Sequence, residues 1–525
     1  MKLIRLSAAL GAVVLGGSFV THAQSGPSGM FRSSAVTVEF TSDGKATFTS
    51  PRGLLIAAAY RVMADTIQFR DESGPAACPN DVGRYLWRTD GDTLRFRLID
   101  DPCAGRRSAF AATWTRVASA LVLTGATVID GTGAAARTGM TLVLRDGIIA
   151  ALHADGTAPI PAGAEVRDAR GQWVIPGLID AHVHVATDPN GPDRRDRVER
   201  RLRNALLGGV VAVRDMGGDA RALADLSRAA VTGQIVAPLI RYSAIMAGPE
   251  FFTDPRVRAS SAGVALGSAP WARAVRPEED FRQIVAEAKG AGATGIKFYA
   301  DLDSARMARL SSEAKRQGLS VWAHAAMNLA TPSAIAAAGV QVMSHSVLLT
   351  REATPPTAPG SGRPPFDYSI AGDDAAIRRA IGAMKQHGVL FEPTLFVFRA
   401  PPGAADTALA RRREQRGAEY ARAAHEAGVP ILAGTDGLGG DADGDVPNIH
   451  VEMALLVEKA GLSPMEALVA ATATGAKALG LADTHGTVVV GKAADVVLLG
   501  ADPTADIRNT RNIVDVIQRG RYVRR

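Results

Sequence analysis

The feature that most limits the possible folds is the alternation of short apolar runs and amphipathic segments between residues 174 and 484. A buried strand of a parallel sheet is a nearly continuous apolar run, because helices cover both of its faces. Eight strand–helix units in succession favour a closed barrel. We therefore predict an α/β fold, with a (β/α)8 TIM barrel over 174–484. Its strands are expected within Val174–Val185, Val210–Met216, Leu239–Ala247, Gly295–Asp301, Ser320–Ala325, Val340–Ser346, Val389–Phe398 and Ile431–Asp436.

The segments on either side of this region, 119–173 and 485–525, are rich in β-type residues. Because they flank the same barrel, we predict that they pair with one another in a β-sandwich built from both ends of the region. The expected strands are Leu121–Ile129, Thr141–Leu144, Gly147–Ile149, Thr487–Val490, Ala494–Leu499 and Ile513–Gln518.

Residues 24–118 form a further small antiparallel β-domain by the same criteria. Val36–Phe40 and Thr93–Leu98 alternate apolar and polar side chains, as half-buried strands do. Asp43-Gly44 and Asp90-Gly91 are typical hairpin turns. The pattern resembles a lipocalin-type half-barrel or meander, and it suggests no chemistry.

The first residues have the pattern of an export signal. Lys2 and Arg5 precede an apolar stretch, Ala8–Val20, which is followed by the small residue Ala23. We predict a cleaved signal peptide over 1–23 and an exported protein, periplasmic or secreted. The alternative, a buried N-terminal helix, is disfavoured by two adjacent glycines inside the stretch.

Export changes the interpretation of the only two cysteines, Cys78 and Cys103. In an oxidising compartment such a pair favours a disulfide, and the alternative is two buried free thiols. Two cysteines are too few for a multi-bridge scaffold or a four-cysteine zinc module.

Charge and hydropathy exclude two classes of partner. The 59 basic and 53 acidic residues give a net charge of only +6, and the basic runs carry interleaved acids. This is typical of solvated helix faces, so no nucleic-acid partner is expected. Outside the extreme N-terminus no apolar run reaches about 18 residues, so no membrane anchor is expected.

Residues of metal-binding type interrupt the ends of five predicted strands. Active sites of (β/α)8 barrels lie at the carboxyl ends of the strands, and imidazole and carboxylate groups are ligands of Zn²⁺ and similar ions. Taken alone, each such residue is at least as well explained as a core histidine, a turn former or a lysine that reaches solvent. Their coincidence at one end of the barrel favours a metal site formed by His182, His184, Lys297, His324, His345 and Asp436.

Three stretches carry a family resemblance. Val174–His184 resembles the first-strand signature of the amidohydrolase superfamily, and Gly208–Gly218 resembles its second strand. Gly486–Leu499 is similar to the strand that returns to the flanking sheet. The resemblance covers about 120–525 and is greatest to the imidazolonepropionase- and prolidase-like group.

The resemblance implies a site for two divalent metal ions, with Zn²⁺ the expected metal. His182, His184 and Asp436 would hold the more buried ion, and His324 and His345 the more exposed one. Lys297, carboxylated by CO2, would bridge the two ions. Asp436 would move the proton of the attacking hydroxide to the leaving amine.

Other polar residues are weaker candidates. Tyr299 follows Lys297 by two positions, so it is predicted either to donate to the substrate oxyanion or to pack as a strand aromatic. His450 and Glu452 are predicted to lie on a surface helix face, and the alternative is that they support the metal ligands from outside the ligand set. Arg214 and Asp215 are predicted to form a structural ion pair.

These observations predict an exported metal-dependent hydrolase that cleaves an amide or peptide C–N bond of a small molecule. Dipeptides and N-acyl amino acids are the expected substrate class. One alternative is a single-metal deaminase or cyclic-amide hydrolase of the same superfamily, from which Lys297 distinguishes the two-metal enzyme. Another is a non-catalytic exported protein that binds its ligand in the β-domain. The sequence leaves a homo-oligomer open.

Overall fold

The computed structural model describes residues 26–524, except 35, 42, 51–52, 118–119, 162–163, 187–193, 358–363, 401–406 and 443. The chain divides into two compact units, Met1–Ala118 and Ser119–Arg525. The predicted signal peptide, 1–23, lies outside the described residues. Within the described part of the chain, no helix has the length and apolar character needed to cross a membrane.

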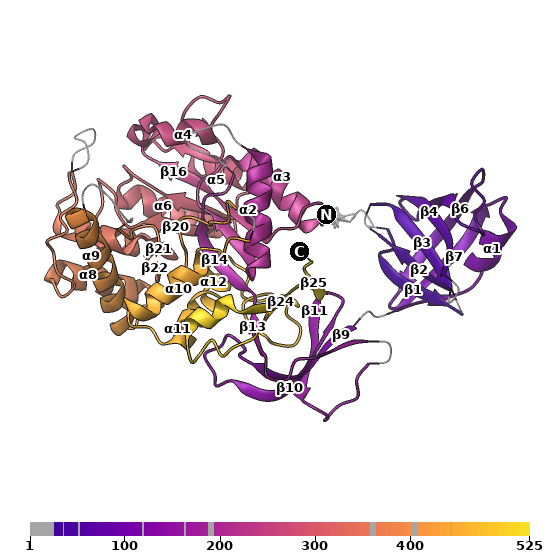
Figure 1. Ribbon diagram of the computed structural model, residues 1–525. Coiled ribbons are helices and arrows are strands. Elements are labelled where there is room, and N and C mark those ends of the chain that lie inside the picture. Colours follow the sequence, from indigo (N-terminus) through magenta and orange to yellow (C-terminus); the bar gives the residue numbers. More distant parts are fainter. Residues whose placement is uncertain are drawn as a thin grey trace, which may run out of the picture. The chain divides into compact units, whose positions relative to one another are not determined.

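The first unit is a closed barrel of antiparallel strands that follow one another in chain order (Figure 1). The predicted antiparallel β-domain and its meander order are confirmed. The sheet is a full barrel and not a half-barrel, because β1 also pairs with β8, through Phe31 opposite Arg116, and this pairing closes the sheet. One short helix, α1 (Ala104–Phe110), lies between the last two strands. The strands are β1 (Gly29–Ser33), β2 (Val36–Phe40), β3 (Lys45–Ser50), β4 (Gly53–Met63), β5 (Thr66–Ser73), β6 (Val82–Asp90), β7 (Thr93–Asp100) and β8 (Trp114–Arg116).

Aromatic side chains form the core of this barrel. On β6, Tyr85 and Trp87 are buried and lie two residues apart, as inward-facing positions of a strand should. Phe110 of α1 packs against Tyr85 and Phe96, with ring distances of 4.9 Å and 4.3 Å. These side chains give the barrel an aromatic core of its own.

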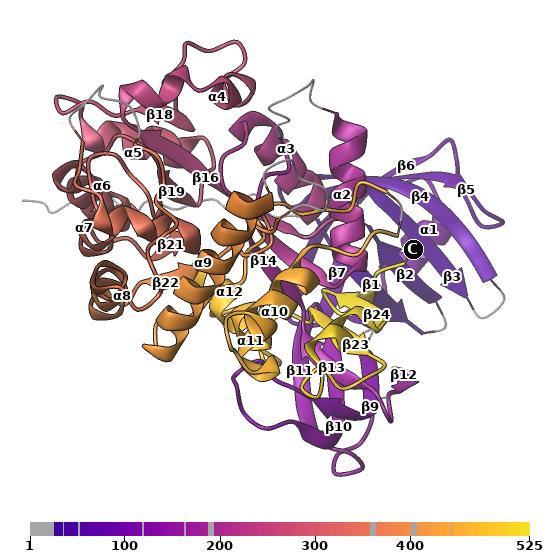
Figure 2. The ribbon, with the colours of Figure 1, turned by 60° about the vertical axis from the view of Figure 1, so that its left-hand side comes forward.

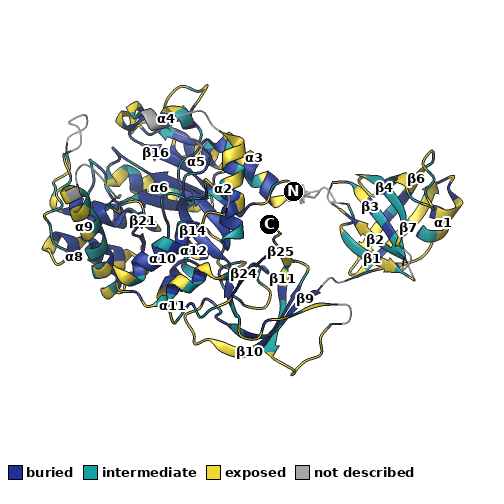
Figure 3. Cartoon of the chain, in the orientation of Figure 1, coloured by how far each residue is buried: buried dark blue, intermediate teal, exposed yellow. Residues whose placement is uncertain are grey.

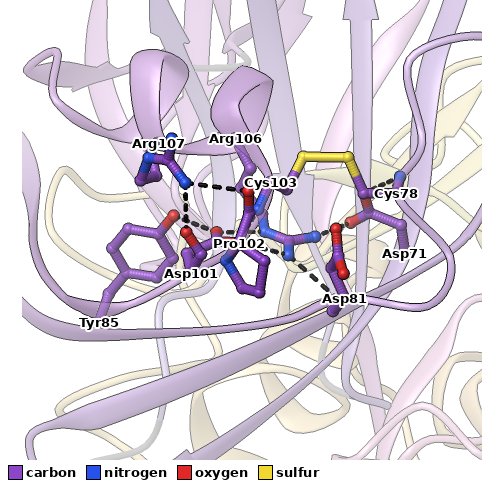
Figure 4. The surroundings of a disulfide bond; sticks show 9 residues. All are labelled: Asp71, Cys78, Asp81, Tyr85, Asp101, Pro102, Cys103, Arg106 and Arg107. Carbon is purple, nitrogen blue, oxygen red and sulfur yellow. Dashed lines mark hydrogen bonds and ion pairs between the residues drawn. A yellow bond between two sulfur atoms is a disulfide. The ribbon is translucent and has the colours of Figure 1, made fainter.

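A disulfide and a buried ion cluster fix α1 to the strands (Figure 4). Cys78 and Cys103 are bonded, which confirms the predicted pair. Arg106 of α1 forms ion pairs with Asp71 at 2.7 Å and with Asp101 at 2.6 Å, and all three side chains are buried. Such a cluster is stable only while each charge keeps its partner. The disulfide therefore holds together a part of the barrel that tolerates little displacement.

Cys103→Ser is expected to lower the free energy of unfolding of this barrel by about 2–5 kcal/mol, because the open chain gains conformational entropy. Hydrogen exchange of peptides from β5 to α1, followed by mass spectrometry, measures the change. Peptides of the second unit serve as the internal control. Unchanged protection in the variant and in reduced wild type would show that the bond contributes no stability.

The second unit contains a nine-stranded sheet with seven parallel strands in chain order (Figure 2). The first seven predicted apolar runs each contain one of these strands. The short strand β18 pairs with β16, and β17 pairs with β18. The strands are β14 (Leu178–Val183), β15 (Val210–Asp215), β16 (Leu239–Ala247), β17 (Ser268–Ala269), β18 (Ala272–Ala274), β19 (Gly295–Phe298), β20 (Ser320–His324), β21 (Val342–Ser344) and β22 (Leu390–Glu392).

The eighth predicted run, 431–436, lies between the last and the first of these parallel strands. Leu432 N donates to Phe391 O of β22 at 2.8 Å, and Ala181 N of β14 donates to Ala433 O at 3.2 Å. The run has one isolated bridge, between Phe391 and Ile431. Hydrogen bonds on both sides therefore connect the two edges of the sheet.

Helices alternate with the parallel strands, and the strands form the buried centre of the unit (Figure 3). Asp280, Asp303 and Asp374 each accept a backbone N–H at a helix N-terminus, which satisfies an otherwise unpaired donor. The helices are α2 (Arg195–Leu207), α3 (Ala220–Val231), α4 (Pro255–Ser260), α5 (Phe281–Gly290), α6 (Ser304–Arg316), α7 (Pro332–Ala337), α8 (Ala375–His387), α9 (Thr407–Glu426), α10 (Ile449–Glu458), α11 (Pro464–Ala470) and α12 (Ala473–Ala478). Short 3-10 helices are η1 (Pro249–Thr253), η2 (Ser346–Ala353) and η3 (Ile507–Arg511).

The two ends of the unit form a separate eight-stranded sheet. β13 is parallel to β9 and antiparallel to β23, so it joins segments far apart in the sequence. The predicted pairing is confirmed, but the strands form one continuous sheet instead of the two sheets of a sandwich. They are β9 (Ala120–Val128), β10 (Arg137–Arg145), β11 (Ile148–Ala154), β12 (Glu165–Asp168), β13 (Trp173–Pro176), β23 (Val496–Leu499), β24 (Ile513–Gln518) and β25 (Arg521–Tyr522).

Two strand predictions need correction. The first apolar run splits at Gly177, where β13 ends and the sheet of β14 begins; a Cβ at Gly177 would lie 2.3 Å from the Val211 side chain. Residues 487–490 do not form a strand. Val488 is buried, but Val489 and Val490 are exposed. Of these three valines, only Val488 therefore packs into the core.

Candidate metal centre

The carboxyl ends of the parallel strands bring two histidines and an aspartate together. His182 is in β14, His184 follows that strand, and Asp436 ends the run beside it. Asp436 Oδ1 lies 3.1 Å from His184 Nε2 and 3.4 Å from His182 Nε2. The three ligand atoms lie within 4.8 Å of one another. Two imidazoles and a carboxylate are a suitable donor set for a divalent ion such as Zn²⁺.

The other predicted ligands lie beside this group. Lys297 Nζ, from β19, is 3.3 Å from His182 Nε2. The ring of His345 lies 4.9 Å from that of His182 and 4.6 Å from that of His324, which ends β20. The structure thus brings all six predicted residues into one cluster. Among the described residues, one further group has metal-type ligands, Asp71 with Cys78 and Cys103, whose cysteines form the disulfide.

Burial favours the neutral, metal-binding forms of His182, His324, His345 and Lys297. It lowers the pKa of His345 to about 3 and holds the pKa values of His182 and His324 well below the usual range. Burial also lowers the pKa of Lys297 to about 8. A neutral amine is the form that reacts with CO2, so this environment favours the predicted carboxylation.

Asp436 is ionised in the same environment. Burial opposes its charge, but His182, His184 and His345 outweigh burial and hold the pKa of Asp436 well below its usual range. Its backbone is also fixed: Asp436 N donates to His182 O at 2.8 Å. The Asp180 carboxylate accepts from both N and Oγ1 of the preceding residue, Thr435. An anionic carboxylate is thereby held against the imidazoles.

Backbone conformation is unusual at the cluster. His345 and Asp436 have φ values of 77° and 56°, in the left-handed region that non-glycine residues rarely adopt. Such conformations cost about 1–3 kcal/mol each and persist where surrounding contacts impose them. Here the hydrogen bonds around the cluster supply those contacts.

The sequence analysis missed Glu392, at the end of β22. Its carboxylate is fully buried and accepts from His182 Nδ1 at 2.8 Å and from Arg214 Nη2 at 2.8 Å. The available signal was a lone carboxylate in the apolar run Val389–Phe398. Gly434 makes room for it, because a Cβ there would lie 2.6 Å from Glu392 Oε1.

Two of the weaker predictions, the Arg214–Asp215 ion pair and a surface position for His450 and Glu452, were wrong. Arg214 pairs with Glu392 and not with Asp215, whose carboxylate instead accepts backbone N–H groups, including Val185 N at 2.7 Å. Parallel β15 directs successive side chains to opposite faces, so neighbours cannot meet. His450 and Glu452 are both fully buried and not on a surface face, because α10 is enclosed on this side.

Tyr299 lies next to the cluster. Its ring is 4.5 Å from the His324 ring and 4.5 Å from the Phe251 ring, and Lys297 Nζ is 5.4 Å from its centre. Tyr299 therefore packs against other aromatic rings, and it also lies next to the predicted ligands.

Comparisons with known proteins agree with this arrangement. The amidohydrolase family model matches residues 173–523. An uncharacterized protein of Mycobacterium tuberculosis is 30% identical over 356 residues, which are 65% of this chain and 82% of that protein. An imidazolonepropionase of Anaeromyxobacter dehalogenans is 30% identical over 355 residues, which are 64% of this chain and 78% of that enzyme.

A solved structure of a prolidase has a similar fold. A prolidase complexed with N-methylphosphonate-L-proline is 25% identical, with a TM-score of 0.61 over 78% of this chain and 100% of that one. Because the family match covers most of the second unit and includes every residue of the cluster, the chain belongs to the amidohydrolase family, in its imidazolonepropionase- and prolidase-like group, and is a hydrolase acting on C–N bonds.

Proposed function

We propose that the chain is an exported metal-dependent peptidase or amidase that cleaves dipeptides or N-acyl amino acids. The observation that carries the proposal is the position of Lys297, 3.3 Å from His182 Nε2 and inside a cluster of further metal-type ligands. The similarity to a prolidase with a proline phosphonate supports a small substrate with an amide bond. The disulfide supports an oxidising compartment, periplasmic or extracellular.

We infer further that the parallel strands and the run 431–436 form a (β/α)8 barrel. Hydrogen bonds from this run to β22 and to β14 support closure of the sheet. The cluster would then lie at the carboxyl-terminal mouth, where barrel enzymes carry their active sites.

The donor set fits two divalent ions, with Zn²⁺ the expected metal. His182, His184 and Asp436 would hold one ion and His324 and His345 the other, with carboxylated Lys297 shared between them. When bound, such ions polarise a substrate carbonyl and make water more acidic.

The chain's own residues would handle the proton and the substrate. Asp436, ionised and fixed beside His182 and His184, can accept a proton from the attacking water and deliver it to the leaving amine. Tyr299, adjacent to Lys297, can donate a hydrogen bond to the substrate oxygen as negative charge develops there. The imidazoles of His182 and His345 would serve as metal ligands, which leaves an oxygen of Asp436 as the base of the cluster.

Metal-reconstituted protein screened with dipeptides and N-acyl amino acids tests the proposal. Release of a free amino acid, lost on chelation and restored by Zn²⁺, is the expected result. Release of ammonia with one ion per chain would instead indicate the single-metal deaminase. Protein that binds metal and hydrolyses no substrate of either class would contradict the proposed activity.

A further inference from the structure

β22 contributes no predicted metal ligand, yet the chain at its end contacts two of the histidines. Glu392 Oε2 accepts from His182 Nδ1 at 2.8 Å and from Ser344 Oγ at 2.6 Å. Two residues later, Thr394 Oγ1 lies 2.8 Å from His345 Nδ1. In both imidazoles, therefore, the ring nitrogen Nδ1 has a partner from this one segment.

The Glu392 carboxylate is itself fixed in place. Its second oxygen, Oε1, accepts from Arg214 Nη2 at 2.8 Å, and Arg214 Nε donates to Ala181 O at 2.5 Å. The Arg214 guanidinium also lies 4.6 Å from the centre of the Trp322 ring. Since all these groups are buried, the carboxylate has little freedom to turn away from His182.

Thr394 is held from another direction. It is fully buried, with φ of 51°. The buried Glu452 carboxylate of α10 accepts Leu395 N at 3.0 Å and Phe396 N at 2.6 Å, which fixes the backbone immediately after Thr394. Contacts with α10 therefore help to fix the position of the Thr394 hydroxyl.

We propose that Glu392 and Thr394 are positioning residues that orient His182 and His345 for two different metal ions. A ring nitrogen that binds a metal carries no proton, so Nε2 is the ligand when Nδ1 holds the proton. Glu392 selects this form at His182, because an ionised carboxylate can only accept from Nδ1–H. The Thr394 hydroxyl would accept from Nδ1–H of His345 when Nε2 binds a metal, and it thereby fixes the plane of that ring. The inference rests on the proposed function, which assigns these histidines to separate ions.

Thr394→Val tests the second half, because it removes the hydroxyl with almost no change of shape. Partners that orient metal ligands are typically worth about 10–100-fold in metal affinity. We expect a loss of this size for one of two ions, unchanged affinity for the other, and recovery in Thr394→Ser. Titration of metal-free protein with Zn²⁺ in competition with a chelator measures both affinities.

Thr510→Val is the matched control. Thr510 is also fully buried, and its Oγ1 lies 2.9 Å from Nδ1 of His450, a buried histidine outside the cluster. Thermal unfolding of the metal-free variants should show similar losses of stability for Thr394→Val and Thr510→Val. Only Thr394→Val should lose metal affinity.

Glu392→Gln tests the first half. It keeps the shape but removes the charge opposite Arg214, so unfolding of the metal-free variant is measured alongside metal binding. Weaker binding of the ion that Thr394→Val leaves unchanged is expected. If this variant does not fold, Ser344→Ala is measured in its place. It removes one hydrogen bond to Glu392, and a smaller loss of affinity for the same ion is expected.

Wild-type affinity for both ions in Thr394→Val, or an equal loss in Thr510→Val, would overturn the positioning role. Those outcomes leave the proposed function intact, provided that wild-type protein binds two ions and hydrolyses its substrate. Wild-type protein that binds no divalent ion would overturn both.

Discussion

Asp436→Asn is expected to lower kcat by about 10²–10⁴-fold while KM changes far less, because general acid–base catalysis typically contributes this amount. Asparagine keeps the size of the side chain and one oxygen that can face a metal. It cannot take up the proton of the attacking water or pass it to the leaving amine. The effect should therefore fall on turnover and not on substrate binding.

The contacts of Asp436 explain why no neighbour can replace it. Its pKa is held well below the usual range, so it is ionised at neutral pH, whereas burial keeps His182 and His345 neutral and weakly basic. Within the cluster it is the anionic group nearest to His184 Nε2, at 3.1 Å. Asparagine at this position cannot accept the proton, and the imidazole nitrogens that face the cluster would be engaged as metal ligands.

Asp441→Asn is the matched control, since Asp441 lies five residues later and pairs with Arg197 at an exposed position. Steady-state kinetics of both variants on a cleaved amide are compared at equal metal content. Near-normal kcat in metal-loaded Asp436→Asn would show that the proton moves through another group.

Lys297→Ala is expected to reduce bound metal from about two ions per chain to about one and to abolish most activity. Groups that only orient metal ligands are worth about 10–100-fold in affinity or activity, and a direct bridging ligand should exceed this. The buried amine lies 3.3 Å from His182 Nε2, and its carboxylated form is the ligand proposed to be shared by the two ions.

Metal analysis of dialysed protein measures the stoichiometry, with Lys289→Ala on the exposed face of α5 as the control. A short carboxylic acid is expected to restore part of the activity of Lys297→Ala, because it can enter the space left by the side chain and supply the missing oxygens. Two tightly bound ions and unchanged activity in Lys297→Ala would contradict the bridging role.

Local patterns in the sequence were enough to locate most strands of the second unit. Each parallel strand is buried on both faces, so its apolar run is visible without knowledge of its neighbours. The polar residues at the ends of those runs, such as Lys297 and His324, were visible for the same reason. The Cys78–Cys103 disulfide followed from the scarcity of cysteine together with the predicted export.

Strand ends and closures were decided by contacts between distant segments. The run from Val174 to Val185 was predicted as one strand although Pro176-Gly177 interrupts it, and at Gly177 the chain passes so close to the Val211 side chain that a Cβ would lie 2.3 Å from it. Closure of the first barrel depends on the pairing of Phe31 with Arg116, far apart in the sequence. Neither contact leaves a pattern in the sequence of a single segment from which it could be predicted.

The sequence by itself determined which side chains of the cluster interrupt buried strands, because that interruption is a property of each segment alone. Only the tertiary structure decided how they are held. Glu392 meets His182 across 210 residues of sequence, and Glu452 reaches the backbone of Leu395 across 57. A buried carboxylate requires partners, but its own segment does not specify which ones. The folded sheet alone fixes those partners, because it places the end of β22 between β14, β21 and α10.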